Sequence, residues 1–365
     1  MTESIVSPAA LHDWVDTLWR AAGSRATEAR LSADMLVGAN LAGHDSHGVG
    51  MVPRYVKSWQ ANELQLNRHV LEVGRSGSLL TLDGQRGMGP VVAFEAMERA
   101  IAVARDSGIC AMGLRNAHHI GRIGQWAEQA VAEGMVSVHF VNAVSKAVVA
   151  PHGGSKGRFV TNPFAVGIPV PGREPLLLDF ATSAIAMGKV RVAHNKGVAV
   201  PPGALIDAQG RATQDPGVMF PPAGAEHGAL LPFAAHKGYA LAMVCEVLGA
   251  ALTGGATTRP ETTTMQHGVW NNMLAIVFDP ARLNSGAAFG AEVQAFVEWV
   301  QSSALRPDAQ AILMPGDPER ASRIARAAAI PIDAETLAEL DQAAAAVAAT
   351  RGQAVAPLSP RTTPA

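Results

Sequence analysis

The sequence predicts an α/β protein with a layered core and helical segments at both ends of the chain. Helical and strand periodicities alternate between about residues 76 and 280, which is typical of a sheet covered by helices. Outside this part, apolar residues repeat at the spacing of helices. The chain has 365 residues, of which 48% are hydrophobic and 16% charged, so a large buried core is expected.

The N-terminal helices are predicted by their end signals. Ser7 is expected to cap the first helix, whose apolar positions repeat at helical spacing until Gly23. A second helix is expected to end at Gly43, because glycine is favoured just past a helix C-terminus. A third helix is expected to begin near Pro53.

The central and C-terminal elements follow in order along the chain. Strands are predicted at residues 78–84, 109–114, 135–142, 175–180 and 273–278. Helices are predicted at residues 89–108, 121–134, 238–253, 291–301, 318–329 and 335–349, and Asp333 is expected to cap the last of them. The proline-rich tail, residues 351–365, has no apolar period and is predicted to be disordered.

Bulk properties exclude some classes of partner. A net charge of −2 gives no basic face for nucleic acid or for an anionic membrane. Cys110 and Cys245 lie in apolar runs, so buried free thiols and a reducing compartment are expected. No signal peptide pattern is visible, and the longest apolar stretch is short and carries Glu246, so we expect a cytoplasmic protein.

The turn "NAHHIGRIG", residues 116–124, lies between a predicted strand and a predicted helix. No Gly-x-Gly-x-x-Gly run follows a strand, which argues against a standard Rossmann site. Gly121 and Gly124 open the helix, where backbone N–H groups favour an anion, and Arg122 adds a forked cation. The turn either binds a pyrophosphate or is a plain connection, and both interpretations stay open.

Histidines are concentrated in a few motifs, and "HDSHG", residues 44–48, is the densest. Three interpretations compete for it: a metal site, a catalytic acid and base, or a polar turn after a helix. The spacing lacks a recognisable third and fourth metal ligand, whereas imidazole suits proton transfer near neutral pH. Ser46 offers the ring of His47 an orienting partner, and the carboxylate of Asp45 is expected to raise the pKa of a neighbouring imidazole.

Two further stretches point to function. Residues 150–169 are rich in glycine, proline and small polar residues, and so long a loop is usually functional. Asp179 is expected at a strand end, where a carboxylate either binds ribose hydroxyls or caps the next helix. Thr182 and Ser183 follow as possible helix caps.

As a set, six motifs resemble the type-2 malate/L-lactate dehydrogenase family, and most closely its hydroxycarboxylate dehydrogenase branch. They are "HDSHGVGMVPRY", "NAHHIGRIG", "APHGG…TNPFAVGIP", "LLLDFATSAIAMGKVRVA", "HKGYALAM" and "LMPGDPER", in this order from about residue 10 to 335. The resemblance implies a three-layer α/β/α domain with a mixed sheet, the non-Rossmann fold of the L-sulfolactate dehydrogenase type. It also implies NAD or NADP as cofactor and a homodimer whose subunits share the active site.

The expected domains follow from this resemblance. Residues 1–75 form a helical segment with the catalytic histidine, and residues 76–280 form the cofactor-binding α/β domain. Residues 281–350 form a C-terminal helical segment that packs with the N-terminal one, and residues 351–365 form the tail.

The resemblance also assigns roles to single residues. It makes His47 the proton donor and acceptor, oriented by Ser46, with His119 as a second active-site histidine. Thr161 matches a substrate-contacting threonine, and Arg54 is the candidate that holds the substrate carboxylate. The residues that match cofactor contacts are Gly121, Arg122, Ile123, Asp179, Phe180, Ala181, Thr182, Ser183, His236, Gly316, Asp317, Pro318 and Glu319. No metal is expected.

Two positions depart from the family pattern. Met51 stands where many members have an arginine for the substrate carboxylate, so Arg54 or Arg122 is expected to replace it. Lys189 stands where members that act on cyclic imino acids have an aspartate. The expected function is a dehydrogenase that interconverts 2-oxo acids and 2-hydroxycarboxylates of the malate, lactate or aryl-lactate type. The alternatives are a cyclic imino-acid reductase, a metal-dependent hydrolase and a binding or scaffold protein without catalysis.

Overall fold

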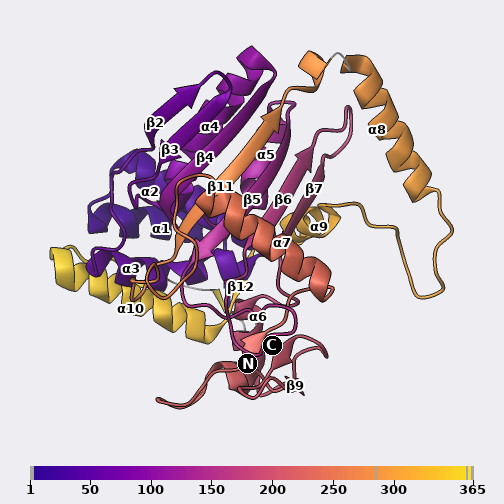
Figure 1. Cartoon of the computed structure of the whole chain (residues 1–365). Coiled ribbons are helices and arrows are strands. Elements are labelled where there is room, and N and C mark those ends of the chain that lie inside the picture. The colour runs from indigo at the N-terminus through magenta and orange to yellow at the C-terminus, as the bar shows by residue number, and fades with distance from the viewer. Residues whose placement is uncertain (1–3, 284–285, 359–360, 363–365) are drawn as a thin grey trace.

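The computed structural model describes residues 4–283, 286–358 and 361–362, and a seven-stranded mixed sheet forms its centre (Figure 1). The strand order is β2-β3-β4-β11-β5-β6-β7. All neighbours pair antiparallel except β3 and β4, which are parallel. The strands are β2 (Leu71–Ser76), β3 (Leu79–Asp83), β4 (Ile109–His118), β5 (Val136–Val144), β6 (Pro163–Ile168), β7 (Leu176–Ala181) and β11 (Trp270–Phe278).

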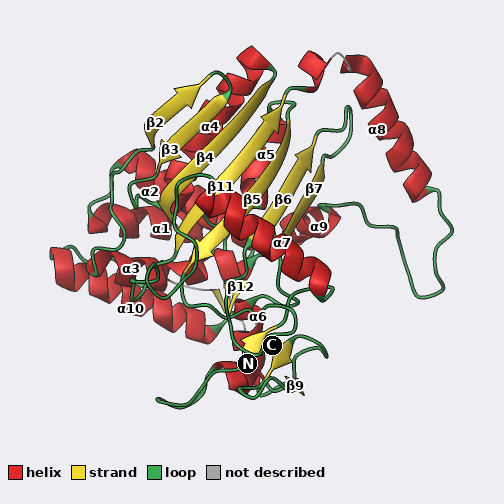
Figure 2. Ribbon diagram, in the orientation of Figure 1, coloured by secondary structure: helices red, strands yellow, loops and turns green. Residues whose placement is uncertain are grey.

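Helices cover both faces of this sheet (Figure 2). On one face lie α4 (Gly89–Ser107), the crossover between the two parallel strands, and α5 (Gly124–Ala132). On the other face lies α7 (His236–Glu246), which continues into a π-helical turn at Val247–Ala251. The predicted three-layer α/β/α architecture with a mixed sheet is therefore confirmed.

A second core joins the two ends of the chain. Ser7 caps α1 by accepting a hydrogen bond from the Ala10 N–H at 3.2 Å, and Asp333 caps α10 through the Thr336 N–H at 2.9 Å. Trp19 and Val347 are both fully buried in this core. Its elements are α1 (Pro8–Ala22), α2 (Ala26–Leu41), α3 (Val52–Gln60), α10 (Ala334–Arg351), β1 (Ser4–Val6) and β12 (Ile330–Ile332).

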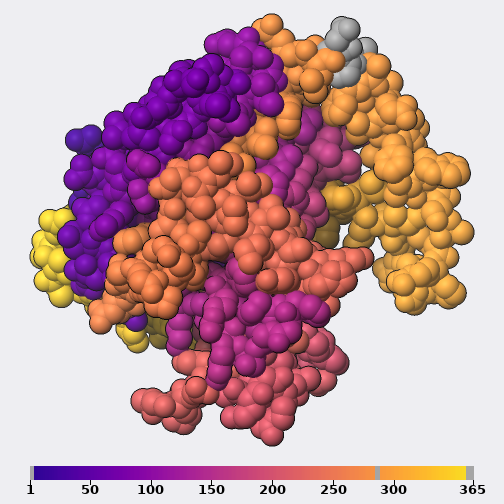
Figure 3. All heavy atoms as spheres, viewed as in Figure 1, coloured from indigo at the N-terminus to yellow at the C-terminus, as the bar shows by residue number. Residues whose placement is uncertain are grey.

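The C-terminal segment divides differently from the expected 281–350 unit. Only the part from β12 onward contributes to the core of the N-terminal helices. Helix α8 (Gly286–Gln301) instead leaves the body of the molecule as an arm, which Figure 3 shows projecting beside a deep hollow. Phe296 and Trp299 on this arm are 62% and 74% exposed, so the arm buries little apolar surface within the chain.

The prediction of a disordered tail is wrong for the tail residues that the structure describes. Trp14 donates its indole N–H to the Ala356 carbonyl at 3.0 Å, and Leu358 is buried in the N-terminal core. Beyond it, β13 (Arg361–Thr362) pairs antiparallel with β1. Val355, Leu358 and an open strand edge thus hold a segment that lacks periodicity.

Other differences concern weakly patterned strands. The expected loop at 150–169 contains β6, and β2 was not predicted. A third core around Phe159 and Leu205 holds helix α6 (Met187–Lys196) beside a small sheet of β8 (Leu205–Ile206), β9 (Ala212–Thr213) and β10 (Ala229–Leu230). Cys110 and Cys245 are free and buried, as predicted. Within the described ranges, no helix has the length and apolar character that a membrane crossing needs.

Candidate active site

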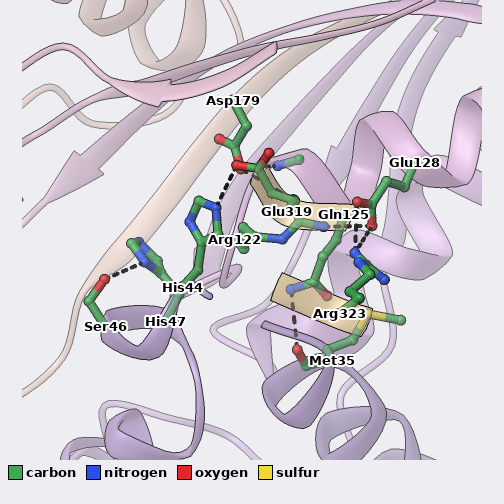
Figure 4. Close-up of polar contacts among 11 residues, drawn as sticks. Met35, His44, Ser46, His47, Arg122, Gln125, Glu128, Asp179, Glu319 and Arg323 are labelled. Carbon is green, nitrogen blue, oxygen red and sulfur yellow. Dashed lines mark hydrogen bonds and ion pairs between the residues drawn. The ribbon is translucent and has the colours of Figure 1, made fainter. Parts of the chain in front are cut away.

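The motif "HDSHG" forms a short 3-10 turn, Asp45–His47, directly after α2 (Figure 4). Asn40, in the last turn of α2, clamps it: its amide oxygen accepts from the Val49 N–H at 2.8 Å, and its amide nitrogen donates to Asp45 at 2.7 Å. A Cβ at Gly48 would lie 2.1 Å from the Asn40 amide oxygen, so glycine is required by this close approach. The turn is thus rigidly placed on the helix end.

His47 lies partly buried at the end of this turn. Its Nδ1 is 3.0 Å from the Ser46 hydroxyl, and its ring stacks on that of His119 with centroids 5.6 Å apart. Burial lowers the pKa of His47 to about 4, and the positive charges of His44 and Arg122 add to this effect. The ring is therefore neutral at pH 7 and ready to accept a proton.

The expected influence of Asp45 on this ring is wrong. The Asp45 carboxylate faces Arg326, whose two nitrogens lie 2.7 and 3.1 Å from its oxygens. Its charge is neutralised there, and the pKa of His47 is lowered instead of raised. Asp45 therefore ties the turn to the C-terminal segment.

His119 follows the end of β4, in the turn that also contains the two glycines. The hydroxyl of Tyr55, from α3, lies 2.6 Å from Nδ1 of His119. The next residue, Ile120, donates its N–H to the Asn271 side chain at 2.9 Å, next to a bulge in β11. Burial lowers the pKa of His119 well below its usual value, with further contributions from the charges of His47, His118 and Arg54.

Arg54 places a cation near His118 and His119. Its guanidinium donates to the His267 carbonyl at 2.6 Å, to the Gly268 carbonyl at 3.3 Å and to the Ser145 hydroxyl at 3.2 Å. Burial is the largest cause of the lowered pKa of His119, and the charge of Arg54 is a further cause. Met51 packs against the N-terminal core, so Arg54 is the better placed candidate for a substrate carboxylate.

Arg122 and the N–H group of Gly124 both have carboxylate partners within the chain. The buried Arg122 guanidinium lies 2.5 Å from Glu128 and 3.6 Å from Asp179, and the Gly124 N–H donates to Asp179 at 2.9 Å. Asp179 lies within β7 and caps α5, and burial raises its pKa. Of the two interpretations that the sequence left open, this arrangement favours the plain connection, because the cation of the turn and a helix-opening N–H group already have carboxylate partners.

The loop Gly316–Glu319 reaches the same place from the start of α9 (Asp317–Ala325). Glu319 lies 3.1 Å from Nε2 of His44, and this hydrogen bond lowers the pKa of Glu319. Arg323 donates twice to Glu128, at 2.8 and 2.9 Å. Asp317 stays local, accepting from the Met314 N–H at 2.7 Å and from Arg320 at 2.6 Å. The predicted cofactor residues Asp179, Arg122 and Glu319 therefore form one charged cluster beside the "HDSHG" turn.

Four other predicted residues, Thr161, Thr182, Ser183 and His236, lie close to the start of α7. Thr182 donates its N–H to the Thr161 carbonyl at 3.0 Å and its hydroxyl to the Asn162 carbonyl at 2.9 Å, and Ser183 forms a bridge to Pro232. His236, the first residue of α7, lies with its ring against His152. The side chains of two predicted cofactor residues pack inside the protein. Ile123 is buried in the sheet core, and Phe180 packs between Phe164 and Phe233.

Sequence reasoning missed the residues that hold the site together. Tyr55 lies inside a quoted motif and is one of only two tyrosines, which was an available signal. Asn40 lies just before the glycine turn, where a side-chain clamp is common. Asn271 and Arg326 gave no local signal, because their partners are far away in the sequence.

No metal cluster is found among the described residues: no three histidine, cysteine or carboxylate side chains come together to hold an ion. Exhaustive chelation is accordingly expected to leave activity unchanged. The check is turnover after dialysis against a strong chelator, with a zinc add-back as control. Loss of activity that zinc restores would contradict the assignment of "HDSHG" to proton transfer.

The structure thus combines a mixed-sheet α/β/α domain, in place of a Rossmann fold, with a pair of stacked histidines beside the N-terminal helices. The chain belongs to the malate/L-lactate dehydrogenase family, whose profile matches residues 6–341.

Individual relatives agree with this placement. The chain is 50% identical over 326 residues to hydroxycarboxylate dehydrogenase B of Escherichia coli strain K12, covering 89% of each protein. A solved structure of a malate/lactate dehydrogenase-type protein from E. coli superposes with a TM-score of 0.89 at 48% identity, covering 93% of this chain and 94% of that one. Sulfolactate dehydrogenase from Methanocaldococcus jannaschii has a TM-score of 0.83 at 27% identity, covering 96% and 98%, which agrees with the expected fold type.

Proposed function

We propose that this protein interconverts 2-oxo acids and 2-hydroxycarboxylates, with NAD or NADP as its redox partner. The observation that carries the proposal is the stacked pair of neutral imidazoles, His47 and His119, with the guanidinium of Arg54 near His119. A proton acceptor next to a forked cation suits a substrate that has a hydroxyl and a carboxylate on neighbouring atoms.

Each residue has a distinct task in this scheme. A bound nicotinamide supplies or accepts the hydride at carbon 2 of the substrate. His47, held at Nδ1 by Ser46, takes the hydroxyl proton in oxidation and returns it in reduction. Arg54 pairs with the substrate carboxylate, and the negative charge of that carboxylate raises the pKa of His47 when the acid binds. Thr161 is proposed to contact the substrate, as the resemblance implies.

The charges of the site suggest how a dinucleotide is held. The turn at Gly121 is bordered by the carboxylates of Asp179 and Glu319, which suit ribose hydroxyls better than phosphates. The N-terminus of α7 carries His236 and Lys237, so its positive end suits the diphosphate. The space over Gly121 is open, since a Cβ there would have only the Gln125 amide nitrogen nearby, at 3.9 Å. The residues present therefore fit a dinucleotide.

Gly121→Ala is expected to weaken nucleotide binding, because its methyl group would enter this open space. Gly121 has a φ of +74°, so the substitution also strains the backbone by about 1–2 kcal/mol. Gly134→Ala is a matched control, because Gly134 has a φ of +75° with nothing near its Cβ. Calorimetric titration with NADH and NADPH should show a raised Kd in the Gly121 variant alone. Equal binding in both variants would return the turn to a purely structural role.

A homodimer is part of the proposal. Large apolar side chains are exposed on α7 and just beyond it, at Met243, Val244, Val247 and Leu252, and on the α8 arm at Phe296 and Trp299. Exposed apolar patches of this kind commonly mark interfaces between subunits. An arm that leaves its own body is suited to contact a second copy, which is how the two subunits would share the active site.

Sedimentation velocity is expected to show twice the chain mass, and Leu252→Glu should shift the equilibrium toward the monomer. Val73→Glu, at an exposed apolar position on edge strand β2, serves as the control. A monomer at micromolar concentration in the unmodified protein would contradict the dimer.

The experiment that tests the proposed activity is a substrate panel followed at the absorbance of the reduced nucleotide. Pyruvate, oxaloacetate, 2-oxoglutarate and phenylpyruvate are each supplied with NADH and with NADPH, and a cyclic imino acid is included. Turnover of at least one 2-oxo acid, faster than that of the imine, is expected. A protein that reduces only the imine would contradict the proposal despite Lys189, and one that reduces nothing would refute dehydrogenase activity on these acids.

A further inference from the structure

Tyr55 is a buried residue in contact with His118, the last residue of β4, and with His119, which follows it. Its ring meets that of His118 edge-on, at 5.0 Å and 87°. Its hydroxyl oxygen lies 2.6 Å from Nδ1 of His119 and 3.3 Å from the His119 carbonyl oxygen. The hydroxyl has one proton to give, and these two atoms of His119 are the candidates to receive it.

The distances indicate where this proton goes. Burial raises the pKa of Tyr55, so the hydroxyl stays protonated, and burial with nearby positive charge keeps His119 neutral. A neutral imidazole carries a single N–H. The contact with Nδ1 is shorter than that with the carbonyl by more than half an ångström. If Nδ1 accepts the tyrosine proton, the ring proton must be on Nε2.

We propose that Tyr55 is a positioning residue that holds His119 in its Nε2–H tautomer, so that His119 donates a fixed hydrogen bond to an oxygen of the bound substrate. This inference rests on the proposed function for the identity of the substrate. The two stacked rings then have different roles. His47 exchanges a proton with the substrate, whereas His119 keeps its proton and orients the substrate oxygen that accepts its hydrogen bond. Among the described residues, Nε2 of His119 has no hydrogen-bond partner, which leaves it available for a ligand.

The test is nitrogen NMR of protein labelled with ¹⁵N at histidine, because protonated and unprotonated ring nitrogens have well separated shifts. The free protein is expected to show His119 with Nε2 protonated and Nδ1 unprotonated. Tyr55→Phe should convert this signal to a mixture of tautomers. The chain has two tyrosines, so Tyr239→Phe is a matched control, and its ring lies against Phe159 instead. An unmodified protein with Nδ1 of His119 protonated would overturn the inference without any variant.

Kinetics provide a second, separate readout. A lost hydrogen bond of the neutral type is worth about 0.5–1.5 kcal/mol, so Tyr55→Phe should lower kcat by about 2- to 13-fold while the nucleotide KM stays unchanged. An unchanged kcat would overturn the role of His119 as a donor. Because the NMR signal needs no substrate, failure of the proposed dehydrogenase activity and failure of the tautomer assignment are distinguishable.

Discussion

His47→Ala is expected to lower kcat for 2-oxo acid reduction by about 100- to 10,000-fold, the usual effect of removing a positioned acid or base. His47 is the partly buried ring whose Nδ1 contacts the Ser46 hydroxyl and that stacks on His119. The dissociation constant for the nucleotide should change little. The measurement is steady-state turnover together with calorimetric titration of NADH and NADPH.

His69→Ala is the control, because His69 is an exposed histidine bonded to Glu95 away from the site. A folded His47 variant with unchanged turnover would refute the assignment. The lowered pKa also fixes the sign of the pH dependence in oxidation, which needs neutral His47. In kcat/KM for oxidation, which reports the free protein, neutral His47 should therefore remain available as pH falls below 6.5 and should be lost only near pH 4.

Arg54→Met should lower kcat/KM for the acid by about 10- to 150-fold, because a hydrogen bond to a charged group contributes about 1.5–3 kcal/mol. Arg54→Lys should recover only part of this loss, since an ammonium lacks the fork that matches a carboxylate. The loss should appear mainly with substrates that carry the carboxylate. Steady-state kinetics with a 2-oxo acid and with its uncharged amide make the comparison.

Arg54 also anchors the backbone at residues 267–268, so a control for loop movement is needed. Glu63 accepts the N–H groups of Gln266, His267 and Gly268, and Glu63→Ala therefore loosens the same loop without removing the cation. If both variants lose the same activity, Arg54 acts through the loop, and the assignment of the carboxylate to Arg54 is contradicted.

The fold was predictable where local chemistry determines an element. Ser7, Gly23 and Asp333 mark helix ends through contacts within a few residues, and all three hold those positions. β6 was not predicted as a strand because its sequence contains Pro163 and Gly167. Gly167 allows α5 to approach the sheet, since a Cβ there would lie 2.9 Å from the Ala127 carbonyl oxygen. Such a requirement is set by packing between distant elements and leaves no periodic pattern.

In the candidate site, too, contacts between chain neighbours were predictable and contacts between distant residues were not. The contact of His47 with Ser46 lies between neighbours in the chain, and it could be anticipated. The ion pairs and the pKa of His47 could not be anticipated, because they depend on which charges the fold brings together. Arg122 forms ion pairs with Glu128 and Asp179. Arg326, from the C-terminal segment, forms an ion pair that neutralises Asp45. The first fact favours one of two interpretations that the sequence left open, and the second reverses the expected effect of Asp45 on the pKa of His47.

The most direct test of the central claim is to follow the hydride itself. The protein is incubated with a 2-oxo acid that it reduces in the panel and with nucleotide deuterated at the transferring carbon, and the product acid is examined by mass spectrometry and proton NMR. The account predicts one deuterium at carbon 2 of a 2-hydroxycarboxylate, formed at least about 100-fold more slowly by His47→Ala. Product without deuterium at that carbon, or equal rates in the two proteins, would contradict it.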